Sequence, residues 1–211
     1  MADASRFPQG IVINVDDLTS IRPVGTIVRL STTGAMYVSI NGASAAYAPV
    51  KSVQLGAITS ASSSVGGSAA EVAFDQTVVI AANSLQTGST LRISAHGNFP
   101  TTVGTDTCTI KLQLVSGVTT RTIMDLGAVD VADNDIFALD ATVTIRTSAG
   151  GIVVSGFGAT GTAGSANPTI FGTTVSTVGA LTTAWTVQLT AQWSTSNANS
   201  AILQSLVVDA Q

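Results

Sequence analysis

The feature that most constrains this chain is a strict alternation of apolar and polar residues. In the segment 107–114 (TCTIKLQL) every even position is apolar and every odd position is polar. Successive side chains of a β-strand point to opposite faces of the sheet, so this period predicts a strand with one buried and one solvated face. The same alternation recurs in the segments 91–96, 139–146 and 185–193. The chain is therefore expected to build its core from β-strands.

Less regular segments extend this prediction over the last two thirds of the chain. No window has the i, i+3, i+4, i+7 apolar spacing of an amphipathic helix. We expect residues 71–211 to form about eight or nine antiparallel strands that pack as a two-sheet, all-β sandwich. Clusters of Gly, Asn, Asp and Ser separate the expected strands, as turns require. The less regular strands are predicted near residues 72–80, 119–127, 151–159, 169–178 and 201–209.

Residues 1–51 differ in character from the rest of the chain. Short strands are predicted near 11–15, 24–30 and 35–41, and Ser31–Gly34 is expected to be the turn of a hairpin. The segment has few large apolar residues, so it is expected to fold poorly alone and to need a partner surface. We interpret it as a small N-terminal β-rich attachment segment.

Residues 52–70 have the composition of a linker. The run from Ser60 to Ser68 consists of Ser, Ala, Gly and Val. A flexible chain of this kind spans roughly 25 Å, from about 5–6 Å times the square root of its length. We therefore predict three parts, which are an attachment segment at 1–51, a linker at 52–70 and a sandwich at 71–211.

The composition argues against several kinds of partner. Only 9% of the residues are charged, against about a quarter in a typical soluble domain, and the formal net charge is −4. The Lys and Arg residues form no basic stripe, so we expect no nucleic-acid binding. No apolar run is long enough to cross a bilayer, so no membrane partner is expected. A chain with so little charge has little self-repulsion and suits a place inside an assembly.

The cysteine content and the first residues bear on the compartment. A single cysteine, Cys108, cannot form a disulfide within the chain, so a disulfide-rich secreted scaffold is not expected. The first residues have neither a basic n-region nor an apolar h-region, so we expect no signal peptide. Synthesis in a cytoplasm is the expectation that follows.

Few residues are candidates for catalysis, and each also has a structural interpretation. Gly156–Gly161 fits G-x-G-x-x-G, but the residues after it cannot form the helix of a dinucleotide site, so we interpret it as a glycine-rich loop. His96 lies on the polar face of its predicted strand, and no G-x-S-x-G sequence accompanies it. Cys108 lies on the apolar face of its predicted strand and is interpreted as a small core residue. We expect no enzymatic activity and no cofactor.

Two groups of residues are candidates for ligand binding. Asp130, Asp133 and Asp135 offer oxygen ligands to Ca²⁺, but their run lacks the EF-hand spacing and also suits a turn, which we favour. Trp185 and Trp193 share one face of a predicted strand and could stack on a sugar. Because that face is otherwise apolar, we interpret both as packing residues.

Several stretches follow one another in an order that resembles a known family. An opening strand runs into a turn in 77–93, Thr and Leu alternate in 107–114, and the segments 189–193, with a tryptophan, and 203–208 close the chain. In this order, residues 76–209 resemble bacteriophage virion proteins with jelly-roll heads. The resemblance implies a jelly-roll sandwich, a homotrimer on the virion surface and a small N-terminal attachment segment. It implies no catalytic residues.

Composition and resemblance lead to one main hypothesis. The chain is a structural virion protein, a capsid decoration or cement protein that binds the major capsid protein on the phage head. Residues 1–51 are expected to grip the capsid, through the apolar residues Phe7, Ile11, Ile13 and Val15.

Two alternatives belong to other functional classes. The first is a tail fibre or receptor-binding protein that recognises host-surface glycans, with Trp185, Trp193 and the loop 130–135 exposed. The second is an enzyme such as a depolymerase, for which the sequence shows no residues that meet the geometric requirements of a catalytic site.

Overall fold

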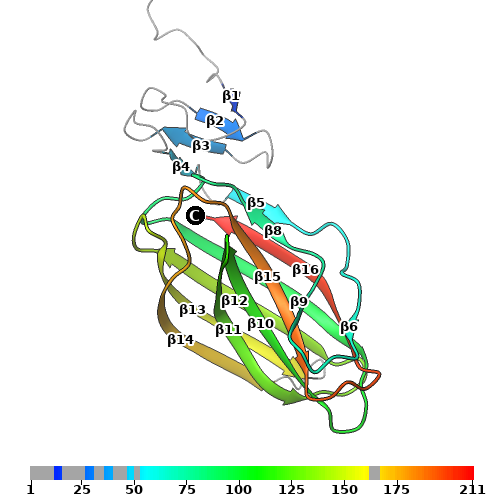
Figure 1. The fold of residues 1–211 in the computed structure, drawn as a ribbon. Helices are drawn as coiled ribbons and strands as arrows, with labels where there is room; N and C mark the ends of the chain where they lie inside the picture. Colours follow the sequence, from blue (N-terminus) through cyan, green and yellow to red (C-terminus); the bar gives the residue numbers. More distant parts are fainter. Residues whose placement is uncertain (1–11, 16–26, 31–35, 40–46, 50–52, 162–166) are drawn as a thin grey trace, which may run out of the picture.

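The protein is an all-β sandwich in its computed structural model. Two antiparallel sheets face each other across a common core, and a third, smaller sheet lies beside one end of this sandwich (Figure 1). No helix occurs among the described residues. The predicted all-β sandwich is therefore confirmed. The structure describes residues 12–15, 27–30, 36–39, 47–49, 53–161 and 167–211.

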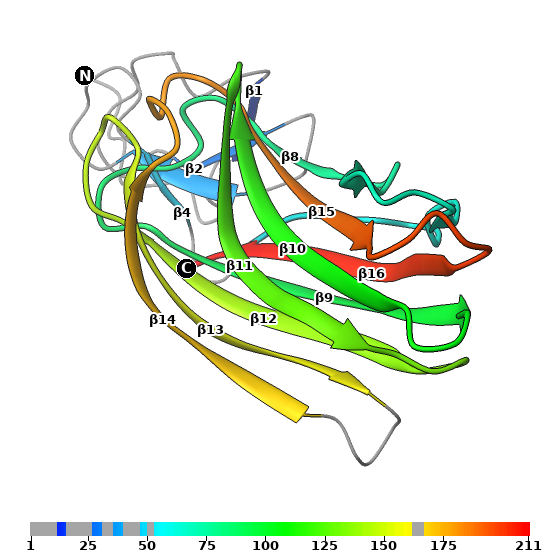
Figure 2. The same ribbon diagram turned by 60° about the horizontal axis from the view of Figure 1, so that its bottom comes forward.

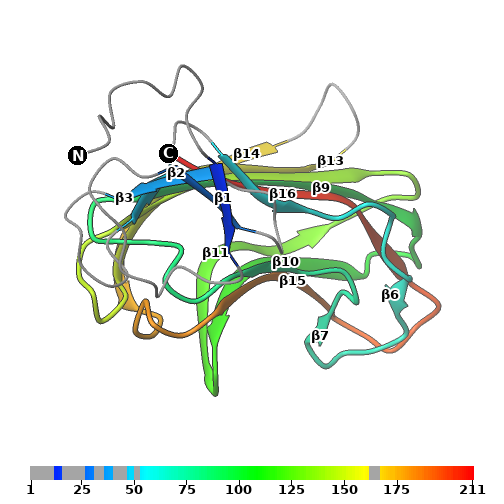
Figure 3. The ribbon, with the colours of Figure 1, turned by 90° about the horizontal axis from the view of Figure 1, so that it is seen from above.

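The larger sheet has seven strands and forms one layer of the sandwich (Figure 3). Every pair of neighbouring strands in it is antiparallel. In spatial order the strands are β14 (Asn167–Thr177), β13 (Gly151–Gly161), β12 (Ile136–Ile145), β9 (Thr90–Thr101), β16 (Ser200–Ala210) and β5 (Val53–Ala57), and β6 (Val65–Gly66) also pairs with β16.

The smaller of the two sandwich sheets, called the smaller sheet below, has five strands and forms the opposite layer. Gly117 has a φ of 57° at the first position of the turn between β10 and β11, as a type II′ hairpin turn requires. The edge strand β11 contacts β13 and β14 of the larger sheet, so the two layers meet along this edge (Figure 2). The strands are β11 (Thr119–Asp130), β10 (Thr107–Ser116), β15 (Trp185–Trp193), β7 (Val72–Ala73) and β8 (Val78–Ile80).

The burial pattern follows the alternation that the sequence predicts. Every second residue of β12 is buried, from Phe137 to Ile145, and the residues between them are partly exposed. In β15 the residues from Trp185 to Trp193 alternate in the same way, apart from Thr190, which is also buried. Burying one face of each strand against the other sheet removes apolar surface from water, and this is the main stabilising contribution in such a sandwich.

A cluster of aromatic side chains lies between the two layers. The ring of Phe99 in β9 lies 5.8 Å from Trp193, edge to face, and 5.4 Å from Phe137. Phe74 stacks on Phe137 at 6.1 Å. All four side chains are at most 1% exposed. These contacts join both sheets and the segment between β7 and β8, so the cluster fixes how the two layers pack together.

The four short strands of the N-terminal sheet lie beside one end of the sandwich (Figure 1). β2 pairs antiparallel with β3, as expected for the predicted hairpin, while β1 pairs parallel with β2. Val28 and Tyr37 are fully buried within the same apolar core that fills the sandwich. The sheet is therefore packed on the sandwich. Its strands are β1 (Val12–Val15), β2 (Ile27–Leu30), β3 (Met36–Ser39) and β4 (Tyr47–Pro49).

The segment expected to be a linker belongs to the sandwich over its described part, residues 53–70. Within it, β5 and β6 both pair with β16. The Ser62 hydroxyl accepts a hydrogen bond from the Leu203 amide at 2.9 Å, and the indole N–H of Trp193 donates to the Val65 carbonyl at 3.3 Å. The prediction of a flexible linker is wrong here. Although the segment is rich in Ser and Gly, pairing with β16 supplies hydrogen-bond partners for its backbone N–H and C=O groups.

Candidate functional site

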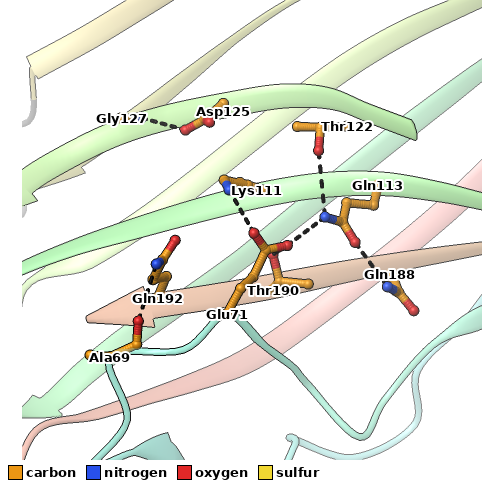
Figure 4. Close-up of polar contacts among 10 residues, drawn as sticks. All are labelled: Ala69, Glu71, Lys111, Gln113, Thr122, Asp125, Gly127, Gln188, Thr190 and Gln192. Carbon is orange, nitrogen blue, oxygen red and sulfur yellow. Dashed lines mark hydrogen bonds and ion pairs between the residues drawn. The ribbon is translucent and has the colours of Figure 1, made fainter. Parts of the chain in front are cut away.

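A network of polar side chains covers the outer face of the smaller sheet (Figure 4). Glu71, just before β7, reaches over β15 and accepts hydrogen bonds from three directions. Lys111 donates to Oε2 at 2.6 Å, while Gln113 donates to Oε1 at 2.6 Å and Thr190 to the same oxygen at 2.9 Å. Gln188 extends the network by donating to the amide oxygen of Gln113 at 2.9 Å. We call these five residues the Glu71 network.

The charges of the Glu71 network hold each other ionised. Partial burial acts to raise the pKa of Glu71, but the hydrogen bonds from Lys111, Thr190 and Gln113 outweigh it, so the pKa is lowered. The hydrogen bond to Glu71 raises the pKa of Lys111 despite some desolvation. The carboxylate and the ammonium group therefore stay charged near neutral pH and already have partners. This arrangement fastens the segment before β7 to the sheet and does not provide a general acid or base.

Removing the Glu71 carboxylate should loosen this attachment. Glu71→Ala takes away three hydrogen bonds and leaves Lys111 without its ion-pair partner. We expect the free energy of unfolding to fall by about 1 kcal/mol, which is less than hydrogen bonds to charged groups usually contribute, because the pair is partly exposed and screened by salt. Urea denaturation would measure this. Glu71→Gln, which keeps an acceptor oxygen without the charge, should lose less; equal stability of the alanine variant and the native chain would contradict the role of the network.

A second polar cluster joins two loops of the sandwich, at the end opposite to β1–β4 (Figure 1). Asp106, between β9 and β10, accepts hydrogen bonds on Oδ2 from Thr195 at 2.7 Å, Asn197 at 2.7 Å and Asn199 at 2.9 Å. Asn199 also accepts a hydrogen bond from the Val103 amide at 2.8 Å. The hydrogen bonds from Asn199, Thr195 and Asn197 lower the pKa of Asp106. The cluster ties the β9–β10 loop to the β15–β16 loop.

The carboxylates of Glu71 and Asp106 should make the stability of the protein sensitive to acid. A carboxylate with a lowered pKa in the folded state contributes stability that is present above its ordinary pKa and lost as the pH falls through the folded value. With ordinary values of 4.5 for Glu71 and 3.8 for Asp106, we expect stability to hold from neutral pH to about 4.5 and to decline below it. Thermal melts between pH 7 and pH 3 test this. Asp106→Asn should show a shallower decline than the native chain, and an identical pH profile would contradict the assignment.

Two of the three candidate metal ligands, Asp133 and Asp135, accept hydrogen bonds from nearby loops. Asp133 accepts hydrogen bonds from the amide and the hydroxyl of Thr102, at 2.6 and 3.0 Å, and Asp135 accepts one from the Ala132 amide at 2.9 Å. Asp130 ends β11 with its side chain exposed. Among the described residues, no three His, Cys, Asp or Glu side chains come close enough to hold a metal ion. The Asp135 contact is thus local to its turn, as the turn interpretation predicted, whereas Asp133 joins its loop to the segment that follows β9.

The residues that were considered for catalysis or sugar binding have surroundings that suit a structural role. His96 is exposed on the outer face of β9, as predicted. Cys108 is buried, and burial raises the pKa of its thiol to about 12, so the thiolate form is disfavoured at neutral pH. Trp185 and Trp193 are each 1% exposed and belong to the core, which confirms the packing interpretation. They offer no exposed platform for a sugar.

The glycine-rich pattern Gly156–Gly161 lies in β13, so its interpretation as a loop is wrong. The strand pairs with β12 on one side and β14 on the other. A side chain at Gly156 would collide with the carbonyl of Asp140 and with the Cα of Ala141 in β12. The glycine therefore serves close packing of two strands rather than phosphate binding.

The candidate attachment residues fall at the other end of the molecule. Ile13 and Val15 lie in β1, where they are paired in register with Val28 and Leu30 of β2. Phe7 and Ile11 lie outside the described residues. The structure thus places Ile13 and Val15 in the small sheet that the sequence predicted as an attachment segment.

Sequence reasoning missed the apolar residues that remain exposed on the sandwich. Phe157 in β13 is 54% exposed, Ile136 in β12 is 39% exposed, and Val118 at the tip of the β10–β11 hairpin is fully exposed. The alternation within β13 could have placed Phe157 on the outer face, because it is out of phase with the buried Ile152 and Val154. On the smaller sheet, Val79 of β8 is 54% exposed and Val72 of β7 is 37% exposed, so exposed apolar residues occur on both layers.

Comparison with known proteins adds no family assignment. A scan against protein-family models found no match, and a search of curated proteins found no significant relative. Within the described part of the chain, no helix is long and apolar enough to cross a membrane.

Proposed function

We propose that this protein is a structural component of a bacteriophage virion that decorates the capsid surface as a homotrimer. The observation that carries the proposal is its construction in two parts, a large sandwich and a separate four-stranded sheet at one end. In this proposal the N-terminal sheet and the residues around it bind the major capsid protein. The sandwich projects from the shell.

The strand order supports a jelly-roll arrangement of the sandwich. Apart from the added hairpin of β13 and β14, the larger sheet runs β5–β16–β9–β12 and the smaller sheet runs β8–β15–β10–β11. Most strands that are neighbours in a sheet lie far apart in the sequence, because the chain crosses repeatedly from one sheet to the other. Such crossings are typical of jelly rolls, a fold common in viral capsid proteins and also in lectins.

The distribution of charge also supports a place within an assembly. No charged residue occurs between Arg146 and Asp209, a stretch that contributes β13, β14, β15 and most of β16. The Glu71–Lys111 and Arg92–Asp140 pairs hold further charges on the sheet faces. Contacts with neighbouring subunits would then need little desolvation of unpaired ions.

The alternative of a glycan-binding tail protein expected Trp185, Trp193 and the loop 130–135 to be exposed, and only residues 132–134 of that loop are. Both tryptophans are buried in the core, so they cannot contribute to glycan binding. Copy number distinguishes the two functions, because decoration requires a subunit at many positions of the shell and a tail organelle requires few. Quantitative mass spectrometry of purified particles, scaled to the major capsid protein, is the test. Decoration is supported if this chain is present in a fixed, small-integer molar ratio to the major capsid protein. It is contradicted if each particle holds only a few copies of the chain.

A further inference from the structure

The strand β14 forms one edge of the larger sheet and pairs with β13 alone among the described strands (Figure 2). Alternate backbone N–H and C=O groups of a strand point to its two sides, so an edge strand presents a row of these groups to its surroundings. The row is interrupted at both ends of β14, because Pro168 has no N–H and the Thr177 carbonyl accepts a hydrogen bond from Arg121 at 2.7 Å. Residues 169–176 lie between these points, and no described strand pairs with their outer side.

The other edges of the sandwich, as far as its strands are described, are either short or charged. At the opposite side of the larger sheet, β5 has five residues and β6 has two. In the smaller sheet, β7 has two residues and β8 has three. The long edge strand β11 carries Arg121, Asp125 and Asp130. Short strands and charged side chains are the usual means by which proteins prevent an edge from pairing with another chain.

The edge strand β14 has neither form of protection. It is 11 residues long and contains no Asp, Glu, Lys or Arg. Thr, Val, Ile and Phe, which favour strands, make up most of its sequence. Phe157 of the neighbouring strand β13, which is 54% exposed, is the register partner of Ile170 and adds apolar surface beside the edge. A long, uncharged edge of this kind pairs readily with another extended strand.

We propose that two copies of this chain pair through β14, antiparallel about a two-fold axis, so that their larger sheets join into one. A two-fold axis brings the same edge of both copies together, and the two stretches 169–176 match in length. Neither copy brings a charge to the contact, since no charged residue occurs between Arg146 and Asp209. The short or charged edges of the sandwich match β14 less well. The pairing does not depend on the proposed function; on a capsid that carries homotrimers, it joins subunits of neighbouring trimers.

Sedimentation equilibrium of the full-length free protein tests this pairing. We expect the mass of the smallest species to double as the protein concentration rises. Val175→Lys introduces a charge at the edge, and the dissociation constant of the doubled species should rise at least about tenfold, because lysines on edge strands oppose pairing. Val153→Lys is the matched control, since Val153 is the register partner of Val175 one strand further from the edge. It should leave the dissociation constant unchanged, and melting temperatures show whether both variants fold.

Hydrogen–deuterium exchange locates the contact in the native chain, independently of either variant. Backbone amides that gain a hydrogen-bond partner on association exchange more slowly with solvent. Raising the protein concentration should therefore slow exchange within residues 169–176. The amides of β5, at the opposite edge of the same sheet, should exchange at an unchanged rate.

Three results would overturn the proposal. They are the absence of a doubled species, a dissociation constant that the two lysine variants change equally, and slowed exchange on association that lies outside β14. The size of the smallest species bears on the proposed homotrimer separately. Three chains support the homotrimer and a single chain contradicts it, whether or not the doubling occurs.

Discussion

A chain that begins at Val53 is expected to fold and to lose its binding to phage capsids. Both sheets of the sandwich and the aromatic cluster lie within residues 53–211, so the truncated chain retains its own core. The four-stranded sheet to which we assign attachment is removed. We expect affinity for the capsid to fall by at least about 100-fold, equivalent to about 2.7 kcal/mol. Co-sedimentation with purified capsids measures the loss.

The controls for this truncation separate binding from folding. Circular dichroism and the melting temperature report whether residues 53–211 keep their β structure. Val118→Ser in the full-length chain changes a fully exposed residue of the sandwich and should leave capsid binding intact. A folded truncated chain that sediments with capsids as the full-length chain does would contradict the assignment of the N-terminal sheet as the anchor.

Trp193→Ala is expected to destabilise the sandwich severely. The indole is 1% exposed, packs edge to face on Phe99 and donates a hydrogen bond to the Val65 carbonyl. Its loss leaves a cavity between the two sheets and removes one attachment of β6. Truncating a large buried aromatic residue costs about 3–5 kcal/mol of unfolding free energy. For a domain with a typical total of about 5–15 kcal/mol, this is a large fraction of the stability.

Equilibrium denaturation in guanidinium chloride measures this effect. Val118→Ala is the matched control, because the side chain at the hairpin tip is fully exposed and its removal should change stability by less than about 0.5 kcal/mol. The Trp193→Ala variant should also expose the segment around Val65 to proteolysis. A variant as stable as the control would show that the aromatic cluster does not hold the layers together.

The sequence predicted the strands well wherever one face of a strand is buried. In β12 the buried residues Phe137, Leu139 and Ala141 alternate with partly exposed ones, so the hydrophobic period reflects the physical arrangement directly. The burial of both tryptophans could be predicted for the same reason, since they share a face with other apolar residues. The alternation identifies faces but not partners, so the order of strands in the two sheets did not follow from it.

Residues 53–70 show why amino-acid composition led to the wrong prediction of a flexible linker. Small residues are common in linkers, but Gly66 is also required where β6 meets β16, because a side chain there would collide with the Asn199 carbonyl. Similarly, Gly97 in β9 packs against the Phe137 ring and the Ile202 carbonyl, where no Cβ would fit. In both places the need for glycine comes from a strand far away in the chain, so no local pattern could have shown it.

The polar contacts were the least predictable part of the candidate site. The alternation placed Lys111 and Gln113 on a solvated face, and it did the same for Gln188 and Thr190. It could not show that Glu71 would join them, because that contact depends on how the segment before β7 crosses β15. Contacts that depend on tertiary register become visible only in the structure.

The proposal that this chain decorates a phage capsid can be tested by electron cryo-microscopy of intact virus particles purified from the source of the chain. We expect sandwich-shaped density at repeated positions across the head, arranged in threes, with each subunit held to the shell through its N-terminal sheet. Density for this chain that is absent from the head, or confined to the tail, would contradict it.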